Sequence, residues 1–186
     1  MLVQEIKNVS LRHFSEKGYE ATSLADIAGE LGKKKQFLYN HFNSKDDLFL
    51  KVMEQVLTEE SLFLNNHFSN YSISVEELLK SFLLTYKERF MKYDYNIKFL
   101  LGMAYLSPIN LKGEATNRVH SFFLKIENLV KSHFLESSQY SSQAEKATSV
   151  FMTAFHGLII ALVNSGVDRF DSKLQFFWEL YWAGLE

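Results

Sequence analysis

Apolar residues recur every three or four positions along almost the whole chain, which is the spacing of one buried face of an α-helix. No segment alternates apolar and polar residues as a half-buried strand would. The eight Gly and the single Pro, Pro108, fall mostly where these periodic segments end. The pattern predicts an all-α protein of about nine helices. They are expected over residues 3–18, 23–32, 34–40, 44–68, 74–90, 94–108, 119–137, 142–165 and 171–186.

Four of the predicted helices begin with a serine that is followed three residues later by an acidic residue. In this capping-box pattern the serine hydroxyl accepts a hydrogen bond from an early amide, and the acidic side chain reaches back. We therefore expect side-chain caps at these four helix starts. The pairs are Ser23 with Asp26, Ser44 with Asp47, Ser74 with Glu77, and Ser142 with Glu145.

The composition is that of a soluble globular protein, with 47% hydrophobic and 23% charged residues. The absence of Cys excludes disulfides, thiolate metal sites and cysteine nucleophiles, and it fits a reducing cytoplasm. The N-terminus carries Gln4, Glu5 and Lys7 within an amphipathic pattern, so no signal peptide is expected. The longest apolar run, residues 157–163, is too short to cross a membrane. We expect a cytoplasmic protein with no membrane partner.

The net charge of −2 does not by itself indicate a nucleic-acid partner. Residues 1–51 hold eight Lys and Arg against seven Asp and Glu, and the other 135 residues hold twelve against fifteen. The basic residues cluster locally, however, as Lys33, Lys34 and Lys35, followed by Lys45. Local clusters matter more than the total charge, because individual side chains make the contacts to phosphate.

Residues 6–48 have the layout of a helix-turn-helix, in which the second short helix crosses the DNA backbone and the third enters the major groove. Their order and spacing also resemble the N-terminal signature of the tetracycline-repressor (TetR) family of one-component regulators. The matching residues are Ile6 to Phe14, Gly18, Tyr19, Thr22 to Leu24, Asp26 to Ala28, Leu31, Gly32, Leu38 to Phe42, Ser44, Lys45 and Leu48. The resemblance implies a DNA-binding domain at 1–46 and an effector-binding and dimerisation domain at 47–186.

Two kinds of DNA contact are expected from this motif. The resemblance implies phosphate contacts for Thr22, Tyr39 and His41, and Lys45 in the first turn of the next helix suits a phosphate as well. Side chains at the start of the third helix would read bases, because Gln pairs with adenine, Lys donates to guanine, and an aromatic edge contacts a thymine methyl. Helix capping remains open for Thr22, and a partly buried structural role for His41. The predicted base readers are Lys34, Lys35, Gln36 and Phe37.

The start of the third helix departs from the family. Members usually carry Val-Ser-Lys-Gly-Thr or a close variant where this chain has Lys33 to Phe37. Lys34 replaces the customary cap, so the helix should lack a side-chain N-cap. Three adjacent lysines at a helix N-terminus also oppose the helix dipole. A DNA polyanion would relieve this strain, whereas a solvated charge run is the alternative interpretation.

The helix predicted over residues 144–164 is apolar on nearly every face, and such a helix must be covered on all sides. A two-fold partner would supply the missing cover, and the family resemblance implies dimerisation through the last two helices. We therefore predict a homodimer. Its expected interface residues are Phe151, Phe155, Leu158, Ala161, Leu162, Phe177, Trp178 and Tyr181.

The same domain is rich in aromatic residues, which could line an apolar cavity with a few polar groups. The resemblance implies that its middle helices bind a small, largely apolar effector. Each of these residues could equally belong to an ordinary core. The candidates are Tyr86, Phe90, Tyr93, Phe99, Met103, His120, Phe122, Phe123, Phe151 and Phe155.

Catalytic chemistry finds little support in the sequence. There is no phosphate loop, no nucleophile-elbow motif and no Cys, and adjacent acidic pairs such as Glu59 and Glu60 point to different helix faces. No cofactor is expected, and the histidines lack the local spacing of a metal site. The favoured hypothesis is a repressor that leaves a palindromic DNA operator when its effector binds. The alternative is a regulator of the same fold that acts through a protein partner and binds DNA weakly.

Overall fold

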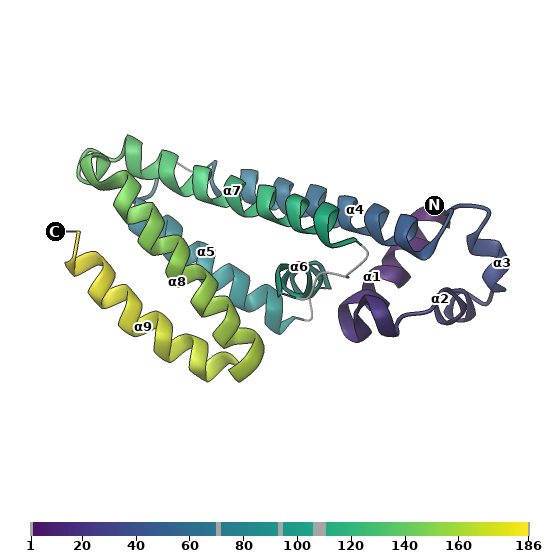
Figure 1. Ribbon diagram of the computed structural model, residues 1–186. Coiled ribbons are helices and arrows are strands. Elements are labelled where there is room, and N and C mark those ends of the chain that lie inside the picture. Colours follow the sequence, from purple (N-terminus) through teal and green to yellow (C-terminus); the bar gives the residue numbers. More distant parts are fainter. Residues whose placement is uncertain (1, 70–71, 93–94, 106–110, 186) are drawn as a thin grey trace. The chain divides into compact units, whose positions relative to one another are not determined.

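The computed structural model describes residues 2–69, 72–92, 95–105 and 111–185, and every regular element within these ranges is helical. The all-α prediction is therefore confirmed. Figure 1 shows α1, α2 and α3 as the three helices that precede the long helix α4. The helices are α1 (Leu2–Ala21), α2 (Leu24–Glu30), α3 (Lys35–Leu38), α4 (Lys45–His67), α5 (Val75–Met91), α6 (Tyr95–Tyr105), α7 (Lys112–Glu136), α8 (Ala144–Ser165) and α9 (Val167–Ala183), with the short 3₁₀ helix η2 (Ser141–Gln143) before α8.

Three of the four predicted side-chain caps are present. Ser23 accepts a hydrogen bond from the amide of Asp26, Ser44 from the amide of Asp47, and Ser74 from the amide of Glu77, at 3.0–3.1 Å. The fourth prediction is wrong, because Gln143 occupies the N-cap position of α8 and makes no side-chain cap bond. Glu145 forms an ion pair with Lys131 on α7 instead.

Glycines with positive φ interrupt α1 and separate α8 from α9. Gly18 (φ +77°) interrupts α1 where the sequence predicts its end. Gly166 (φ +83°) separates α8 from α9 by a single residue, so α9 begins at Val167 rather than near residue 171 as predicted. Only glycine adopts this left-handed backbone without strain, which is why one residue suffices for the turn.

The chain forms two compact units. Unit 1 comprises Met1–Leu64 and Arg89–Phe122, and unit 2 comprises Asn65–Glu88 and Phe123–Glu186. Unit 1 therefore contains the predicted DNA-binding domain of residues 1–46 together with later helices. Its core centres on Phe49 of α4, whose ring contacts Phe14 and Tyr19 of α1 and Phe99 of α6 at 5.0–5.3 Å between centroids.

A buried ion pair joins α4 to the end of α5 within unit 1. The guanidinium of Arg89 donates to both carboxylate oxygens of Glu60, whose side chain is only 1% exposed. The same guanidinium lies 4.5 Å from the centroid of the Phe63 ring. Nearby, Asn96 of α6 donates to the neighbouring carboxylate of Glu59 at 2.8 Å. These contacts hold α4, α5 and α6 together through polar groups as well as apolar packing.

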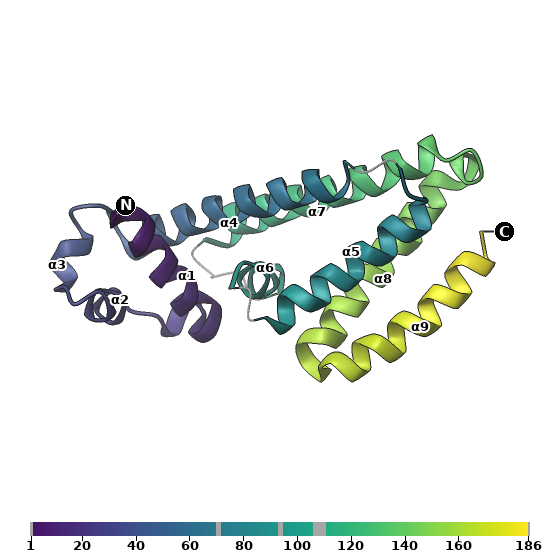
Figure 2. The ribbon, with the colours of Figure 1, turned by 180° about the vertical axis from the view of Figure 1, so that it is seen from behind.

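In unit 2, α8 and α9 run side by side in opposite directions (Figures 1 and 2). Tyr181 of α9 donates to the backbone carbonyl of Ala147 at 2.9 Å, and burial raises the pKa of its hydroxyl. Phe155 of α8 contacts Phe82 and Tyr86 of α5, each at 5.4 Å between ring centroids. Aromatic side chains therefore fill the spaces between α5, α8 and α9.

The segment Ser141–Ser165, which contains α8, is long and apolar enough to cross a membrane, with a mean hydropathy of 1.6 over its most apolar window. Half of that window is buried inside the chain, where Phe151, Phe155 and Leu162 belong to the core of unit 2. Core packing accounts for its hydropathy, since a helix that is covered by its own chain needs to be apolar on several faces.

Candidate nucleic-acid interface

Local sequence determines how α2 starts and ends. Ser23 caps its N-terminus, as described above, and the hydroxyl of Ser23 also donates to the Asp26 carboxylate at 2.8 Å. At the other end, the amide of Gly32 donates to Gly29 and the amide of Lys33 donates to Ala28. These paired bonds, with Gly32 at φ +67°, form a Schellman motif that satisfies the last carbonyls of the helix. The turn that connects α2 to α3 is thereby fixed.

Apolar anchors hold the short helix α3 in place. Ile27 and Ala28 of α2 and Leu38 of α3 are completely buried, and Phe42 follows them into the same core. Lys34 occupies the N-cap position of α3 and makes no side-chain cap bond, which confirms the loss of the cap predicted from the sequence. Because α3 has only four residues, tertiary packing rather than intrinsic helix stability must maintain it.

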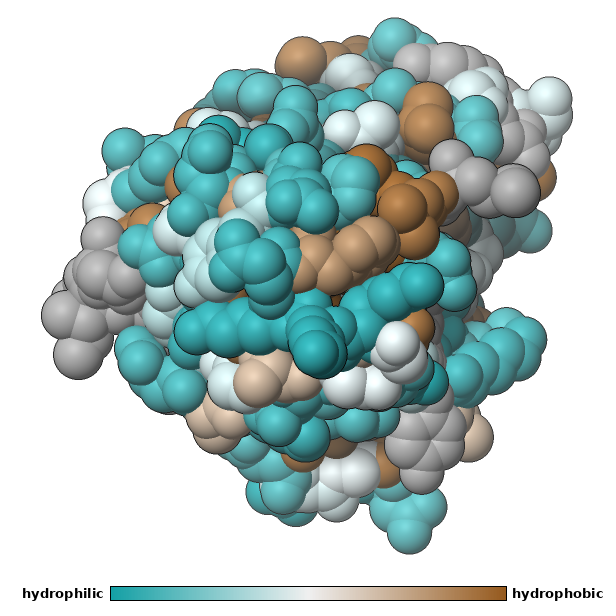
Figure 3. Space-filling model, turned by 90° about the vertical axis from the view of Figure 1, so that its right-hand side faces the viewer, coloured by the Kyte–Doolittle hydropathy of each residue, from teal (hydrophilic) through white to brown (hydrophobic). Residues whose placement is uncertain are grey.

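The outward face of α3 is polar and accessible. Lys34, Lys35 and Gln36 are exposed, and Phe37 is half-buried. The face of the molecule that carries this end of unit 1 is mostly hydrophilic, with small apolar patches (Figure 3). All four predicted base readers therefore have surface available to a partner.

Tyr39 and His41 lie beside these residues. The Tyr39 side chain is 43% exposed, with the Lys35 ammonium 5.6 Å from its ring centroid. His41 is half-buried, and its ring contacts Phe37 edge-on at 5.3 Å. Both side chains retain exposed surface for a polar partner. The contact of His41 with Phe37 also agrees with the alternative interpretation, a partly buried structural role.

Lys45 is held against the helix-turn-helix by an aromatic ring. Its ammonium lies 4.1 Å from the centroid of Tyr19 and 3.4 Å from the backbone oxygen of Glu20. The Tyr19 hydroxyl in turn donates to the carboxylate of Asp46. No local sequence pattern indicates this arrangement, because Tyr19 lies on α1 and Asp46 on α4. It holds the ammonium of Lys45 near Tyr19 and Glu20, at the start of α4.

Thr22 faces inward. Its side chain is 2% exposed, and its hydroxyl donates to the carbonyls of Gly18 at 2.7 Å and His13 at 3.1 Å. The hydroxyl thus closes the corner between α1 and α2, while Ser23 rather than Thr22 caps α2. We therefore leave Thr22 out of the proposed DNA contacts. Its burial is not evident from sequence, because Thr and Ser serve equally well at helix caps and at corners.

The predicted effector-binding residues are divided between the two units. In unit 1, Phe99, Met103 and Phe122 are buried, Phe90 is half-buried and His120 is exposed. In unit 2, Tyr86, Phe151 and Phe155 are buried and Phe123 is half-buried, whereas Tyr93 lies outside the described residues. The exposure of His120 does not fit a place in an enclosed apolar pocket. The buried residues among them belong to the cores of their own units.

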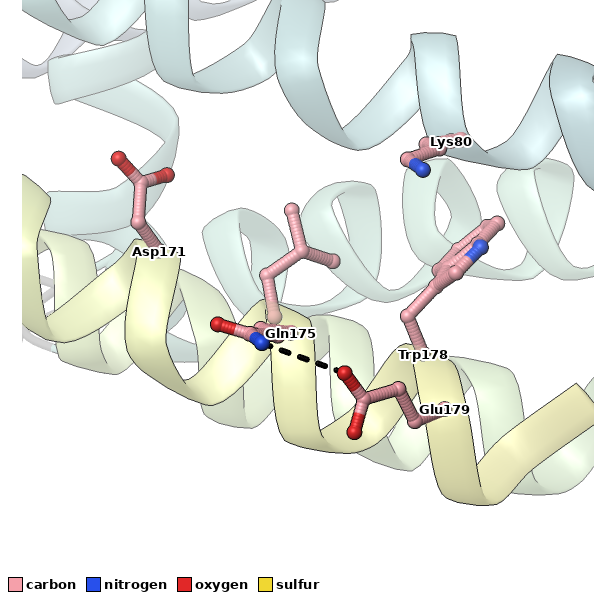
Figure 4. A pocket seen from close by; sticks show the side chains of 6 residues that line it. Lys80, Asp171, Gln175, Trp178 and Glu179 are labelled. Atoms are coloured by element: carbon pink, nitrogen blue, oxygen red, sulfur yellow. Dashed lines mark hydrogen bonds between the residues drawn. The ribbon is translucent and has the colours of Figure 1, made fainter.

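Two surface cavities involve different residues. One, of about 300 Å³, lies in unit 2 between α5 and α9, with Lys80 and Trp178 at one end and Asp171 at the other (Figure 4). Two of its polar groups are already paired, since Lys87 binds Asp171 and the Trp178 indole donates to Glu76. The other, of about 500 Å³, lies in unit 1 and is lined by residues of α1 and α4. Neither cavity is lined by a predicted effector residue.

Seven of the eight predicted interface residues are buried within a single chain; Phe177 alone is half-buried. Phe151, for example, packs against Phe177 and Tyr181 of α9. A different set of apolar side chains is exposed on α8 and α9. They are Val150, Ile160 and Val163 on α8 and Phe176 and Leu180 on α9, with Phe176 62% and Leu180 77% exposed. Any partner of these two helices would meet this second set.

Comparison with known proteins agrees with this geometry. Residues 6–52 match the family model for bacterial regulatory proteins of the tetR family. The chain is 38% identical over 81 residues to a protein of Staphylococcus epidermidis named the biofilm operon icaADBC HTH-type negative transcriptional regulator IcaR. It is 35% identical over 82 residues to the protein of the same name from Staphylococcus aureus strain Newman. Each match covers 42% of this chain and 44% of the relative, so it spans less than half of either protein.

Solved structures extend the likeness of the fold to nearly the whole chain. A TetR-like transcriptional regulator from Rhodococcus sp. RHA1 matches with a TM-score of 0.71 at 19% identity, covering 98% of this chain and 94% of that one. A TetR-family transcriptional regulator from Agrobacterium tumefaciens matches with a TM-score of 0.74 at 18% identity, covering 95% of each chain. The family match therefore covers the helix-turn-helix, residues 6–52, and the fold of nearly the whole chain is similar to that of these two regulators.

Proposed function

We propose that this protein is a cytoplasmic, DNA-binding transcriptional regulator that represses its target genes. The observation that carries the proposal is the exposure of Lys34, Lys35 and Gln36. The capped helix α2 and the Schellman turn position these residues at the start of α3. Exposed basic and amide side chains on the second helix of such a motif suit the edges of bases in the major groove. The relatives named as negative regulators support repression as the direction of control.

Substitutions at Lys45 and Gln36 should separate the two kinds of DNA contact. Lys45→Ala is expected to weaken binding to specific and unrelated duplexes alike, and to reduce the slope of log affinity against log salt by about 0.9. Tyr39→Phe should also weaken binding to both kinds of duplex, but it should leave the slope of log affinity against log salt unchanged. Gln36→Ala should mainly relax the preference at one base step, at a cost of about 1–3 kcal/mol of discrimination. Fluorescence anisotropy with both duplexes at several salt concentrations measures all three.

A uniform loss of affinity for every sequence in Gln36→Ala would remove this residue from the base readers. An unchanged affinity in Lys45→Ala would likewise remove Lys45 from the phosphate contacts. Lys80→Ala is the matched control, because the ammonium of Lys80, like that of Lys45, lies close to an aromatic ring, at 5.7 Å from the centroid of Trp178. It lies in unit 2, remote in the chain from the helix-turn-helix, and should leave DNA binding unchanged.

We further propose that the protein acts as a homodimer on a palindromic operator. Two recognition helices can read two half-sites when they lie about 34–36 Å apart, which is one turn of DNA. The exposed apolar residues of α8 and α9 support a second copy as the partner, because burying them against that copy would remove apolar surface from water. This surface replaces the predicted set of interface residues, most of which belong to the core of unit 2.

An apolar effector completes the proposal. Its binding would favour a state in which the recognition helices no longer fit adjacent half-sites, so operator DNA must weaken effector binding by the same factor. We expect that factor to be roughly 5–150. Once thermal-shift screening of apolar compounds has found a ligand, calorimetry with and without operator DNA measures the coupling. Equal affinities would exclude induction by that ligand and would leave the aromatic residues as core alone.

A further inference from the structure

Lys33 occupies a backbone position that usually carries an apolar residue. It follows Gly32 in the Schellman motif, and its amide donates to the carbonyl of Ala28 at 2.8 Å. The residue at this position commonly packs an apolar side chain against the last turn of the helix. Ala28 is completely buried, yet the side chain of Lys33 is exposed. The turn requires the amide of Lys33 but gains nothing from its ammonium.

The ammonium of Lys33 lies near the predicted base readers of α3. It is 5.6 Å from the centroid of Phe37, one helical turn further along, and Phe37 is among the predicted base readers. In the part of the chain that the structure describes, no carboxylate lies within 4 Å of it. Lys34 and Lys35 follow directly at the start of α3 and are also exposed, so three positive charges lie next to one another in the chain. This arrangement is unfavourable in the free protein and favourable beside an anion.

We propose that Lys33 is an additional DNA contact, which binds a backbone phosphate at the edge of the major groove. Phe37 limits the positions of its ammonium, and the Schellman turn fixes the backbone from which the side chain extends. A lysine ammonium is a compact charge with no planar geometry to match, which suits a phosphate better than one particular base. The inference rests on the proposed DNA-binding function and adds a residue that the family pattern does not supply.

Lys33→Met tests this role, because methionine keeps the length of the side chain and removes the charge. At about 0.1 M salt its affinity for specific and unrelated duplexes should fall on the order of tenfold. The slope of log affinity against log salt should decrease by about 0.9, so the deficit should disappear towards 1 M salt. The melting temperature should stay the same or rise, because the charge repulsion is relieved. Lys33→Arg should retain both affinity and slope.

The duplex is the DNA upstream of the protein's own gene, with an unrelated duplex of equal length beside it. Lys80→Met is the control, since it removes the same charge from a lysine that lies 5.7 Å from an aromatic centroid in unit 2. If Lys33→Met binds like the wild type while Lys45→Ala binds weakly, the proposal for Lys33 is wrong and the DNA-binding function stands. A lowered melting temperature in Lys33→Met would also overturn it, by showing a structural role. If the wild type binds neither duplex, both proposals fail.

Discussion

Replacing Arg89 by methionine is expected to lower the free energy of unfolding by about 3–5 kcal/mol, because it leaves a buried carboxylate without its guanidinium. Glu60 is 1% exposed, and Arg89 donates to both of its oxygens. The substitution also removes the contact between Arg89 and the Phe63 ring. Removing one partner of a buried pair costs much more than the pair itself contributes, since the remaining charge has lost its solvation.

Denaturant unfolding at one fixed protein concentration measures this effect. Arg118→Met is the control, because Arg118 pairs with Glu114 one turn away on the surface of α7, and such pairs contribute about 0.3–0.5 kcal/mol. The double substitution Glu60→Met with Arg89→Met should recover most of the loss, since no buried charge then remains. Equal losses in Arg89→Met and Arg118→Met would contradict the importance assigned to the buried pair.

Leu180→Lys is expected to convert the proposed dimer into a monomer and to reduce operator affinity by a factor on the order of 10²–10⁴, the advantage that a second linked binding site provides. Leu180 is 77% exposed in the single chain, so the substitution should leave the fold of the monomer intact. In a dimer that buries the exposed apolar residues of α8 and α9, the lysine would be desolvated without a partner, at a cost of several kcal/mol.

Analytical ultracentrifugation at micromolar concentration follows the oligomeric state, and circular dichroism verifies the fold. Leu62→Lys serves as the control, because Leu62 is also an exposed leucine, 57% accessible, but lies on α4 in unit 1. It should remain dimeric. A monomeric wild type, or a Leu180→Lys variant that stays dimeric with unchanged operator affinity, would contradict the proposed interface.

Local signals predicted much of the fold. The serines at positions 23, 44 and 74 cap the helices that their sequence patterns indicate, because a capping box needs only four consecutive residues. The same reasoning failed at Ser142, where η2 displaces the start of α8 and Glu145 pairs with a lysine on α7. The start of α9 was predicted too late for a related reason, since a single glycine with positive φ makes the whole turn.

Tertiary contacts explain what the sequence could not provide. Glu60 and Arg89 are 29 positions apart in the chain, and neither residue's local pattern indicates the other. The apolar pattern of α8 predicted cover on all sides, and it could not distinguish the residues that α5 and α9 cover from those that the single chain leaves exposed. Phe155 therefore belongs to the core of unit 2, while Val150, Ile160 and Val163 remain exposed.

The candidate DNA-binding residues show the same division. Exposure of Lys34, Lys35 and Gln36 follows from the helical pattern once Leu38 is placed in the core. Thr22 could not be separated from Ser23 by sequence, because only the fold reveals that its hydroxyl closes a corner. One sequence signal points to Lys33. It is a lysine that directly follows the glycine at the end of α2, where an apolar residue is usual.

Sequence-specific binding to DNA is the central claim, and a gel-shift assay with the DNA upstream of the protein's own gene tests it most directly. Competition with unlabelled DNA of the same sequence and with an unrelated duplex of equal length gives the specificity ratio. We predict a retained complex that the unrelated duplex displaces only at concentrations about 10³-fold higher or more, as is typical of specific regulators. Equal displacement by both duplexes, or no complex at micromolar protein, would contradict the claim and favour a regulator that acts through a protein partner.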